Sequence, residues 1–567
     1  MANSFTDGTP QGTVIIIGMD LVFIQNPECD EIRQQIGARL GISANNVLLN
    51  FSHTHLGPML GWYSNGGVDS EDYPPIGTYT SVPSDEWRAK SSEIWSAFGC
   101  QCNMQARYLA TLRDTLTSVA AAARRSVMPC RVGSATGTSQ LGVNRRLKLP
   151  DGRTIIGINP AGVIDRSVDL IRVDDLEGVT IATILSTAAH PIVLGPATSS
   201  VSSDYVGPAR AIVEEHTNAP CLFLQGAAGN LMPKCGVGAG GPEQFDDLSR
   251  IGAMLGGAAL QLWAEIRTHN SLGKPKVVQS VAVISTYLYE KTESHGLDLT
   301  PNGVPALAVR TTRLTMPLAP YPPLDVAQAR LKMFEKERDA ALLRGAPAGV
   351  NNVAQRMYTW AKAVAEGAAT GHRAPMQEVE VWTMRLNDIA ICAVSAEALT
   401  ELSLEVKARA AASTGGQLRH TLFCGYSNGC LGYLPPPKCF AEGGMEVVES
   451  TWNYNLPSQL TPTWAPAVVD SALRSLCSLT GGNEDVDVAP PSEDFVLRDS
   501  EVFQSDNGQI DGGVRYPVLL QVLVDFLATD GGTSLPQDGL RQKNGVSANP
   551  AAGHSLGDEL LCRPCKL

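Results

Sequence analysis

The stretch NVLLNFSHTHLGPMLG, residues Asn46–Gly61, places two histidines, a glycine and a proline directly after an apolar run. Within it, Val47–Phe51 has the length and composition of a buried strand. A segment with helical periodicity, NPECDEIRQQIGARLG, precedes it, and an apolar run over Thr13–Ile24 comes before that. Strand, helix and strand in this order predict a βαβ unit and therefore an α/β fold, in which helices cover a sheet.

Further elements follow along the chain. We expect an amphipathic helix at Tyr108–Val127, strands in LIRVDD and TIATILSTAAH, and a short strand at Leu222–Leu224. Asp325–Gly367 has helical periodicity interrupted near RGAPAGVNN. EVEVWTMRLNDIAICAVS alternates with period two on both sides of an Asn-Asp pair, which predicts a hairpin. Its terminal serine, Ser395, is expected to cap a helix over residues 396–411.

At 567 residues the chain exceeds what one hydrophobic core usually serves, so two or more domains or sub-domains are expected. The predicted elements end near Leu479. The composition then changes to TGGNEDVDVAPPSED, which is typical of a linker, and we expect an irregular tail over residues 481–567. GVGAGG at Gly236–Gly241 lacks the GxGxxG spacing of a dinucleotide-binding loop and is interpreted as a plain loop.

The charge of the chain argues against some partners. It has 44 Lys and Arg against 57 Asp and Glu, a net charge of −13, which disfavours nucleic acid and anionic membranes as main partners. No apolar run reaches the ~18–20 residues of a membrane span, and the polar N-terminus lacks a signal-peptide pattern. We therefore expect a cytoplasmic protein as the chain stands, or a secreted one if a leader precedes it. Peripheral membrane contact and the oligomeric state are left open.

The histidines are the first candidate site residues. Residues i and i+2 at the end of a strand point the same way, so His53 and His55 are expected to face one pocket. Sites in α/β proteins gather at the carboxyl ends of strands. Such a pair is typical of a metal ligand beside a second polar catalytic group. The alternative is that two polar residues merely leave a strand.

A third histidine has the same local context. TIATILSTAAHPIVLG ends an apolar strand in His190 and a proline. A catalytic zinc takes three or four protein ligands, so further donors are expected at strand ends or turns. Glu397 is a candidate donor, because it lies in the first turn of the predicted helix. The helix dipole alone also favours a carboxylate at this position, which is the alternative explanation for it. Tyr433 qualifies in the Gly/Pro-rich loop GYSNGCLGYLPPPK.

These motifs carry a family resemblance. NVLLNFSHTHLGP resembles the His-Thr-His-Ser-Gly-Pro signature of neutral (non-lysosomal) ceramidases. Further segments resemble the family in the same order over about residues 12–480, namely GVNRR, AAHPIVLGPATSSVSSDYVG, CLFLQGAAGNLMPK, AVSAEALTEL and GYSNGCLGYLPPP…MEVVESTW.

The resemblance implies one large catalytic domain of mixed sheets covered by helices over residues 12–480. It also implies a zinc-dependent amide hydrolase that cleaves an N-acyl amide, ceramide or a related N-acyl amine, to a carboxylic acid and an amine through a zinc-activated water. One Zn²⁺ per chain would be bound by His53, His190, Glu397 and Tyr433. His55 and Arg145 would bind the substrate and take part in catalysis. Asp204 would hold His190 or a loop in place, and a local turn cap is an equal alternative for it.

The chain also departs from the family. Leu56 replaces a serine, and Ala396 and Ala398 flank Glu397 where glycine and phenylalanine are usual. The metal donors survive while the surroundings of the substrate do not, so the reaction type is better supported than the substrate. The family's C-terminal immunoglobulin-like domain is not recognisable in residues 481–567.

Three other interpretations remain open at this stage. One is a TIM-barrel amidohydrolase, in which His-x-His also ends a strand, although the remaining histidines lie mostly in helix or loop contexts. Another is a non-catalytic relative of the ceramidases. The third is a structural zinc site made by Cys424, Cys430 and Cys439 around Tyr433. The irregular spacing of the 13 cysteines instead favours reduced and mostly buried thiols.

Overall fold

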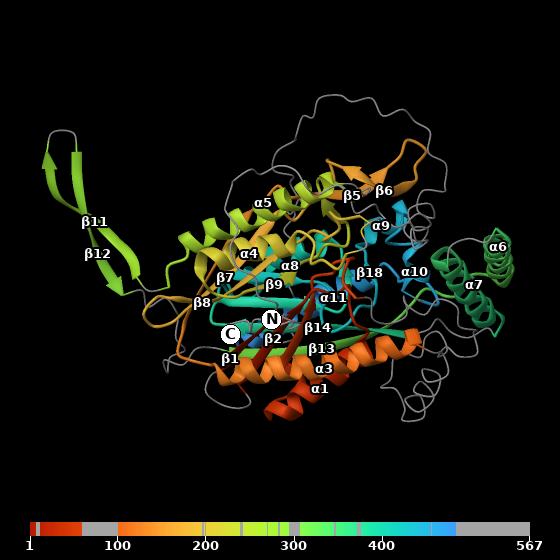
Figure 1. Cartoon of the computed structure of the whole chain (residues 1–567), viewed down its shortest axis with the longest axis horizontal. Helices are drawn as coiled ribbons and strands as arrows, with labels where there is room; N and C mark the ends of the chain where they lie inside the picture. Colours follow the sequence, from red (N-terminus) through yellow and green to blue (C-terminus); the bar gives the residue numbers. More distant parts are fainter. Residues whose placement is uncertain are drawn as a thin grey trace, which may run out of the picture.

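The structure is a computed structural model. It describes residues 1–6, 12–58, 100–195, 198, 200–238, 242–268, 270–281, 284–293, 307–344, 348–370, 376–454 and 456–482. The predicted irregular tail therefore lies outside the described residues from position 483 on, and the loop at Gly236–Gly241 is described only as far as residue 238. Within the described residues the protein is an α/β protein with mixed sheets, as predicted (Figure 1).

The first sheet contains the βαβ unit predicted from the sequence. Its strand order is β1-β2-β3, with β1 antiparallel and β3 parallel to β2. The strands and the helices on their outer face are β1 (Ala2–Thr6), β2 (Thr13–Met19), β3 (Val47–Phe51), α1 (Asn26–Leu40) and α3 (Cys100–Arg125). The chain leaves α1 through Gly41 in the left-handed conformation, which glycine adopts without strain. The predicted strand over Thr13–Ile24 is shorter than expected and ends at Met19.

The second and third sheets each contain four strands, in the orders β4-β7-β8-β9 and β13-β14-β15-β17. The second consists of β4 (Arg131–Thr138), β7 (Ser167–Asp174), β8 (Thr180–Thr187) and β9 (Cys221–Gln225), and is covered by α4 (Val206–Thr217) and α5 (Glu243–Glu265). The third consists of β13 (Leu307–Pro317), β14 (Met376–Leu386), β15 (Ile389–Val394) and β17 (His420–Cys424), and is covered by α8 (Thr400–Ser413) and α11 (Trp464–Leu479). The β14–β15 hairpin turns at Asn387, as predicted.

The inner faces of the three sheets share one hydrophobic core. Val14 and Ile16 of β2 pack in it with Trp382 of β14 and residues of β7, β8, β9, β15 and β17. Ile15 and Ile17, the intervening residues of β2, instead face α1 and α3. Because successive side chains on a strand point to opposite faces, a strand covered on both sides is apolar throughout. This explains why the sequence shows continuous apolar runs here rather than alternation.

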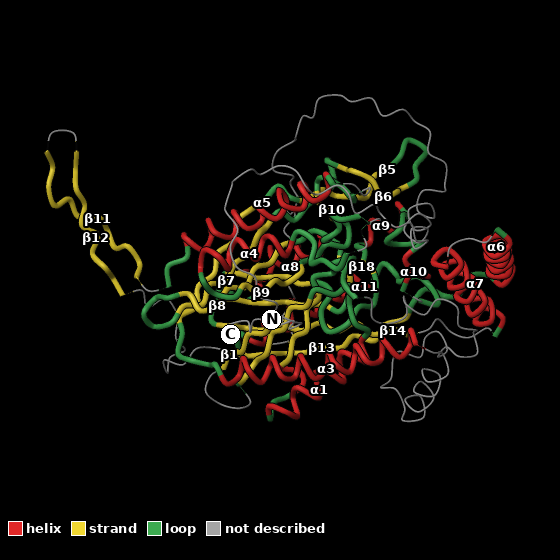
Figure 2. Tube along the Cα trace, in the orientation of Figure 1, coloured by secondary structure: helices red, strands yellow, loops and turns green. Residues whose placement is uncertain are grey.

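The remaining elements are short sheets, connections and two projecting hairpins (Figure 2). They are η1 (Ala44–Asn46), β5 (Gly142–Lys148), β6 (Thr154–Asn159), β10 (Leu231–Pro233), β11 (Asn270–Val281), β12 (Ile284–Glu293), α6 (Leu324–Leu343), α7 (Ala348–Ala369), β16 (Glu397–Ala398), β18 (Tyr433–Leu434), α9 (Pro437–Glu442) and α10 (Ser450–Asn453). The α6–α7 pair confirms the broken helical pattern at residues 325–367. Among the described residues, no helix combines the length and apolar character needed to cross a bilayer.

The predicted first residue of the helix, Ala396, is wrong, because α8 begins at Thr400. The hydroxyl of Ser395 accepts a hydrogen bond from the main-chain nitrogen of Glu380 at 2.7 Å instead of capping a helix. Glu397 stays extended because its N–H donates to Gly432 at 2.8 Å and β16 pairs in parallel with β18. The helix α8 begins only at Thr400, whose N–H donates to the side chain of Asn230 at 2.9 Å. A cap from another segment is not visible in the local sequence.

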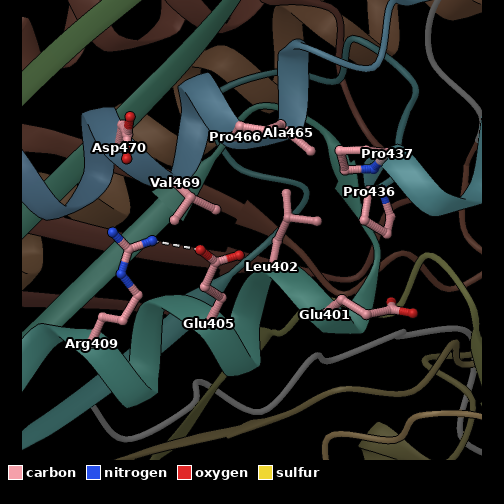
Figure 3. A pocket seen from close by; sticks show the side chains of 10 residues that line it. All are labelled: Glu401, Leu402, Glu405, Arg409, Pro436, Pro437, Ala465, Pro466, Val469 and Asp470. Atoms are coloured by element: carbon pink, nitrogen blue, oxygen red, sulfur yellow. Dashed lines mark hydrogen bonds and ion pairs between the residues drawn. The ribbon is translucent and has the colours of Figure 1, made fainter. Parts of the chain in front are cut away.

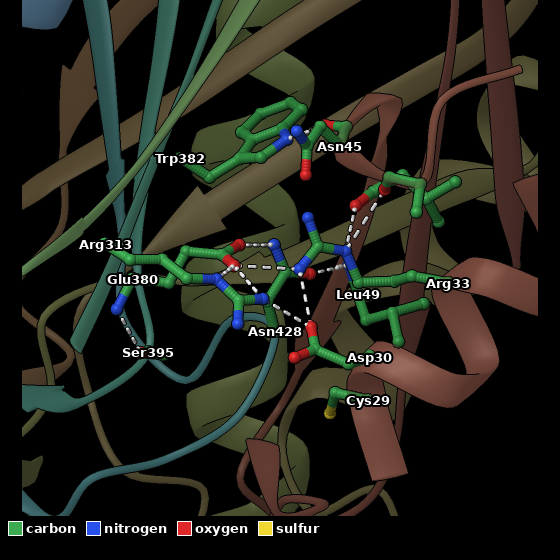
Figure 4. Close-up of polar contacts among 12 residues, drawn as sticks. Cys29, Asp30, Arg33, Asn45, Leu49, Arg313, Glu380, Trp382, Ser395 and Asn428 are labelled. Atoms are coloured by element: carbon green, nitrogen blue, oxygen red, sulfur yellow. Dashed lines mark hydrogen bonds and ion pairs between the residues drawn. The ribbon is translucent and has the colours of Figure 1, made fainter. Parts of the chain in front are cut away.

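A buried polar network ties four elements together (Figure 4). The carboxylate of Glu380 on β14 accepts hydrogen bonds from Arg33 of α1 at 2.9 Å and from Arg313 of β13 at 3.1 Å. It also accepts one at 2.7 Å from Asn428, in the loop after β17. Asp30 pairs with both arginines. Arg33 is 1% exposed, so its charge depends on these partners for compensation.

We expect Glu380→Gln to destabilise the protein by about 3 kcal/mol, because it leaves a buried guanidinium without its main counter-charge. Glu378→Gln is the matched control, since Glu378 makes only an outer ion pair with Arg313 at 3.2 Å, and should cost less than about 1 kcal/mol. Urea unfolding of both variants measures the difference. Equal costs would contradict the role given to Glu380.

Glu28, in the first turn of α1, should make the folding stability of the protein depend on pH. Its Oε2 is buried and has no hydrogen-bond partner among the described residues. Burial raises the pKa of Glu28 from 4.5 to about 7. The folded state therefore holds this proton more tightly than the unfolded state, so its stability contribution is complete below about pH 4.5 and is lost as the pH rises through about 7.

Glu28→Gln keeps the neutral form at every pH. We expect the variant to be about 1–3 kcal/mol more stable than the parent near pH 8.5 and equal to it near pH 4.5. Urea unfolding at both pH values tests this. A difference that does not change with pH would exclude Glu28 as the source.

Candidate metal centre

His53 lies just beyond β3, where the chain leaves the first sheet. Its φ of 64° is left-handed, and its N–H donates to Leu21 at 2.9 Å. The expectation that His53 and His55 share a face through strand periodicity is therefore wrong in its geometry. The two rings nevertheless converge, with their Nε2 atoms 3.4 Å apart. The Nδ1 atom of His53 lies 2.8 Å from the carbonyl oxygen of Val22, so Nδ1 carries the proton and Nε2 is left with a lone pair.

His190 follows β8 and is held in the same way. Its Nδ1 lies 2.7 Å from the carbonyl of Ala228 and 3.0 Å from that of Leu231. Ala228 lies in the turn between β9 and β10, and Leu231 is the first residue of β10. The main chain thus fixes the ring orientation and the tautomer, an arrangement that metal-binding histidines commonly have. Burial lowers the pKa of His53 and of His190 well below the ordinary value, so both imidazoles are neutral at pH 7.

Glu397 on β16 completes the centre. Its Oε2 lies 3.5 Å from Nε2 of His53 and 3.3 Å from Nε2 of His190. Only 1% of the residue is exposed, and burial raises the pKa of its carboxyl group. The parallel pairing of β16 with β18 sets Glu397 opposite Tyr433, which lies on a short strand rather than in the predicted loop.

Arg145 of β5 joins the centre through Tyr433. Its Nη2 donates to the phenol oxygen of Tyr433 at 2.8 Å, and its Nε donates to Glu446 at 3.2 Å. Burial opposes the charge of Arg145, but Tyr433 and Glu446 outweigh it and raise the pKa of Arg145 above the usual value. Arg146 donates to the other oxygen of Glu446 at 2.7 Å. The sequence did not identify Glu446, whose role depends on a contact across 301 positions.

His55 is the exposed member of the histidine group. Its ring centroid lies 5.0 Å from that of His53 and 5.8 Å from that of His190. One ligand atom from each of the three rings lies within 4.8 Å of the others, close enough to share a metal ion. The structure therefore places His55 beside the ligands. The family resemblance assigns it to the substrate.

Asp204 supports the segment after His190 and does not contact the imidazole. Its carboxylate accepts hydrogen bonds from the main-chain nitrogens of Val193 at 3.1 Å and Leu194 at 2.9 Å. It also accepts one from its neighbour Tyr205. These contacts place Asp204 against the loop after His190.

Tyr426 is a site residue that the sequence did not reveal. Its ring stacks on His53 with centroids 4.2 Å apart, and its hydroxyl donates to Oε2 of Glu397 at 3.2 Å. It lies just after β17, in the loop that leads to Tyr433 on β18, and no local signal distinguishes the two tyrosines.

The donor atoms fit a divalent cation of the zinc type. Among the described residues, Nε2 of His190 and Oε1 of Glu397 are buried without any hydrogen-bond partner. Unpaired buried polar atoms are costly and call for an explanation, which a bound ion supplies. Neutral imidazoles and a carboxylate are common zinc ligands. The proposed cysteine site fits less well, because Cys424, Cys430 and Cys439 lie in three different hydrophobic clusters. Among the described residues, the three histidines are the group of potential ligands close enough together to share an ion.

A surface cleft of about 420 Å³ lies elsewhere, between α8, the start of α9, and α11 (Figure 3). Leu402 and Val469 are among the residues that line it, with Glu401 and Glu405 at its edge. None of the predicted site residues is among those lining it. It is thus separate from the histidine centre.

Fold and centre together define an α/β protein with a candidate metal site at the ends of its strands. The described strands form separate mixed sheets rather than a parallel barrel, so the TIM-barrel interpretation is wrong for this part of the chain.

Comparison with solved structures finds a similar arrangement in a neutral ceramidase from Pseudomonas aeruginosa and in a ceramidase complexed with C2. Each is 17% identical to this chain, with a TM-score of 0.49 over 83% of it, and the match covers 66% and 68% of those chains. The chain thus spans about two thirds of their length. No protein-family model and no curated protein matches.

We expect one Zn²⁺ per chain after dialysis, and its loss in His53→Ala, His190→Ala and Glu397→Ala. Each variant removes one of the converging donors, and a site with fewer ligands binds zinc far more weakly. His216→Ala is the control, because His216 packs on Trp263 on the covering helices and should keep full zinc. Metal analysis measures the content. Full zinc in the three ligand variants would exclude this centre.

Proposed function

We propose that the chain is a zinc-dependent amide hydrolase with its domain over residues 12–480. The observation that carries the proposal is the convergence of Nε2 of His53, Nε2 of His190 and the Glu397 carboxylate, with both imidazoles fixed by main-chain carbonyls. The proposal is supported by Nε2 of His190 and Oε1 of Glu397, which have no hydrogen-bond partner among the described residues and which a bound ion would satisfy. The motif resemblance to neutral ceramidases supports the choice of reaction.

His53, His190, Glu397 and Tyr433 would hold the metal. A bound Zn²⁺ supplies Lewis acidity and lowers the pKa of a water molecule to about 7. The residues of this chain then orient the reactants. Water adds to the amide carbonyl carbon, the C–N bond breaks, and the proton passes to the amine nitrogen, which gives a carboxylic acid and an amine.

Arg145 and His55 have separate tasks in this proposal. The Arg145 guanidinium is fixed by Tyr433 and Glu446, so its charge is in place before negative charge develops on the amide oxygen. His55 is exposed and lies next to the ligand imidazoles, where the substrate can reach it. Its ring can carry the proton from the attacking water to the leaving amine.

The proposed substrate class is an N-acyl amide with an apolar acyl chain, ceramide or a related N-acyl amine. This choice follows from the motif resemblance. The replacements at Leu56, Ala396 and Ala398 change the surroundings of the centre, so a screen across acyl lengths and amine head groups is the appropriate test. Such a substrate would bring the protein to a lipid surface without a membrane-spanning helix.

We expect the purified protein to release fatty acid and amine together from at least one member of an N-acyl amide panel, as measured by mass spectrometry. Chelation should stop the release and Zn²⁺ should restore it. Arg145→Gln should keep zinc and lose about 10²–10³-fold in kcat, because one fixed donor to the developing oxyanion is removed. Hydrolysis that continues in EDTA and in the three ligand variants would refute the proposal.

A further inference from the structure

Tyr426 occupies an unusual place in the loop between β17 and β18. It is fully buried, and its φ of 49° is left-handed. For a bulky residue other than glycine this conformation costs on the order of 1–3 kcal/mol and persists only where the surroundings enforce it.

The main chain of Tyr426 bridges the two segments that carry metal ligands. Its N–H donates to the carbonyl of Ala396 at 3.0 Å, one residue before Glu397. Its carbonyl accepts from the N–H of Phe51 at 3.0 Å, two residues before His53. The backbone at this one residue therefore fixes the distance between β3 and β16.

The side chain of Tyr426 then contacts both ligands. Its ring stacks on the His53 imidazole at 4.2 Å with an angle of 29° between the planes. Its hydroxyl donates to Oε2 of Glu397 at 3.2 Å, while Oε1 has no partner among the described residues. The hydrogen bond restricts rotation of the carboxylate, and the stacked ring restricts rotation of the imidazole.

The neighbours of Tyr426 enforce its conformation. Asn428, also left-handed, exchanges two hydrogen bonds of 2.8 Å with the backbone of Leu49 in β3. The side chain of Asn50 donates to the carbonyl of Gly425 at 2.9 Å and to the hydroxyl of Ser427 at 3.0 Å. The loop is thus anchored to β3 on both sides of Tyr426.

We propose that Tyr426 is a positioning residue of the metal centre, which orients the Glu397 carboxylate through its hydroxyl and the His53 ring through stacking. This inference rests on the proposed zinc site. The family resemblance gives Tyr426 no role. Groups that hydrogen-bond to metal ligands typically change metal affinity by 10–100-fold when they are removed.

Tyr426→Phe tests the hydroxyl, because phenylalanine keeps the ring and the burial. The full chain is titrated with Zn²⁺ against a competing chelator and, separately, with Co²⁺ while its visible spectrum is recorded. We expect Zn²⁺ to bind about 10–100-fold more weakly in the variant. We also expect the Co²⁺ absorption bands to shift, because the carboxylate changes its orientation at the ion.

Ser403→Ala is the matched control. Its hydroxyl is also buried and also donates to a buried carboxylate, that of Asp165, at 2.7 Å, but it contacts no ligand of the centre. The Ser403→Ala variant should bind Zn²⁺ with the same affinity as the parent and give the same Co²⁺ spectrum. We expect the melting temperature to fall in both Ser403→Ala and Tyr426→Phe, because each variant loses one buried hydrogen bond.

The outcomes separate the two proposals. If the parent binds Zn²⁺ at one per chain and Tyr426→Phe binds it within a factor of three with an unchanged Co²⁺ spectrum, the positioning role is wrong and the proposed function stands. If Ser403→Ala weakens Zn²⁺ as much as Tyr426→Phe does, the effect is one of general stability and the role is again wrong. If the parent binds no Zn²⁺, both proposals fail.

Discussion

The structure depends on holding the buried Glu397 carboxylate against the buried imidazoles of His53 and His190. A buried charge is costly unless it is paired and hydrogen-bonded, and neither His53 nor His190 is protonated at pH 7 to pair with it. The protein meets this constraint partly through Tyr426, which donates to Oε2, and through the charge of Arg145 nearby. Oε1 of Glu397 and Nε2 of His190 remain unsatisfied by the described residues. A cation bound between these atoms would satisfy both of them, which is consistent with the proposed metal site.

Backbone strain is concentrated where this constraint acts. Six described non-glycine residues have a left-handed conformation, and four of them surround the centre, namely His53, Asp204, Tyr426 and Asn428. Such conformations are retained only where packing and hydrogen bonds over-determine them. The shared core of the three sheets and the Glu380 network supply that rigidity, because Asn428 links Glu380 to the loop that carries Tyr426. The stability of the fold and the geometry of the centre thus depend on the same contacts.

The sequence correctly predicted the secondary-structure elements that depend on interactions between residues close together in the chain. The βαβ unit at residues 13–51 and the β14–β15 hairpin follow from apolar periodicity and turn residues, and both are present. The sequence also placed His53, His190 and Glu397, which the structure brings together. The extended conformation at Glu397 was missed because the partner that enforces it, Gly432, is 35 positions away. Tyr426 was missed for the same reason, since its importance arises from contacts with β3 and β16 rather than from its neighbours.

The charges around the centre explain why a divalent ion suits it. Arg145 and Arg146 share the Glu446 carboxylate, and Arg146 also reaches the half-exposed Glu442. Together with Glu397, the carboxylates of this group outnumber the guanidinium groups by one. A bound divalent cation would reverse that balance and would leave these groups with one positive charge in a low-dielectric setting, where electrostatic interactions are strong. A surplus positive charge stabilises the anion that forms when water adds to an amide carbonyl, more than it stabilises the neutral amide. In the proposed reaction, the guanidinium groups of Arg145 and Arg146, which are held by the Glu446 carboxylate, would keep this field in place before the substrate arrives.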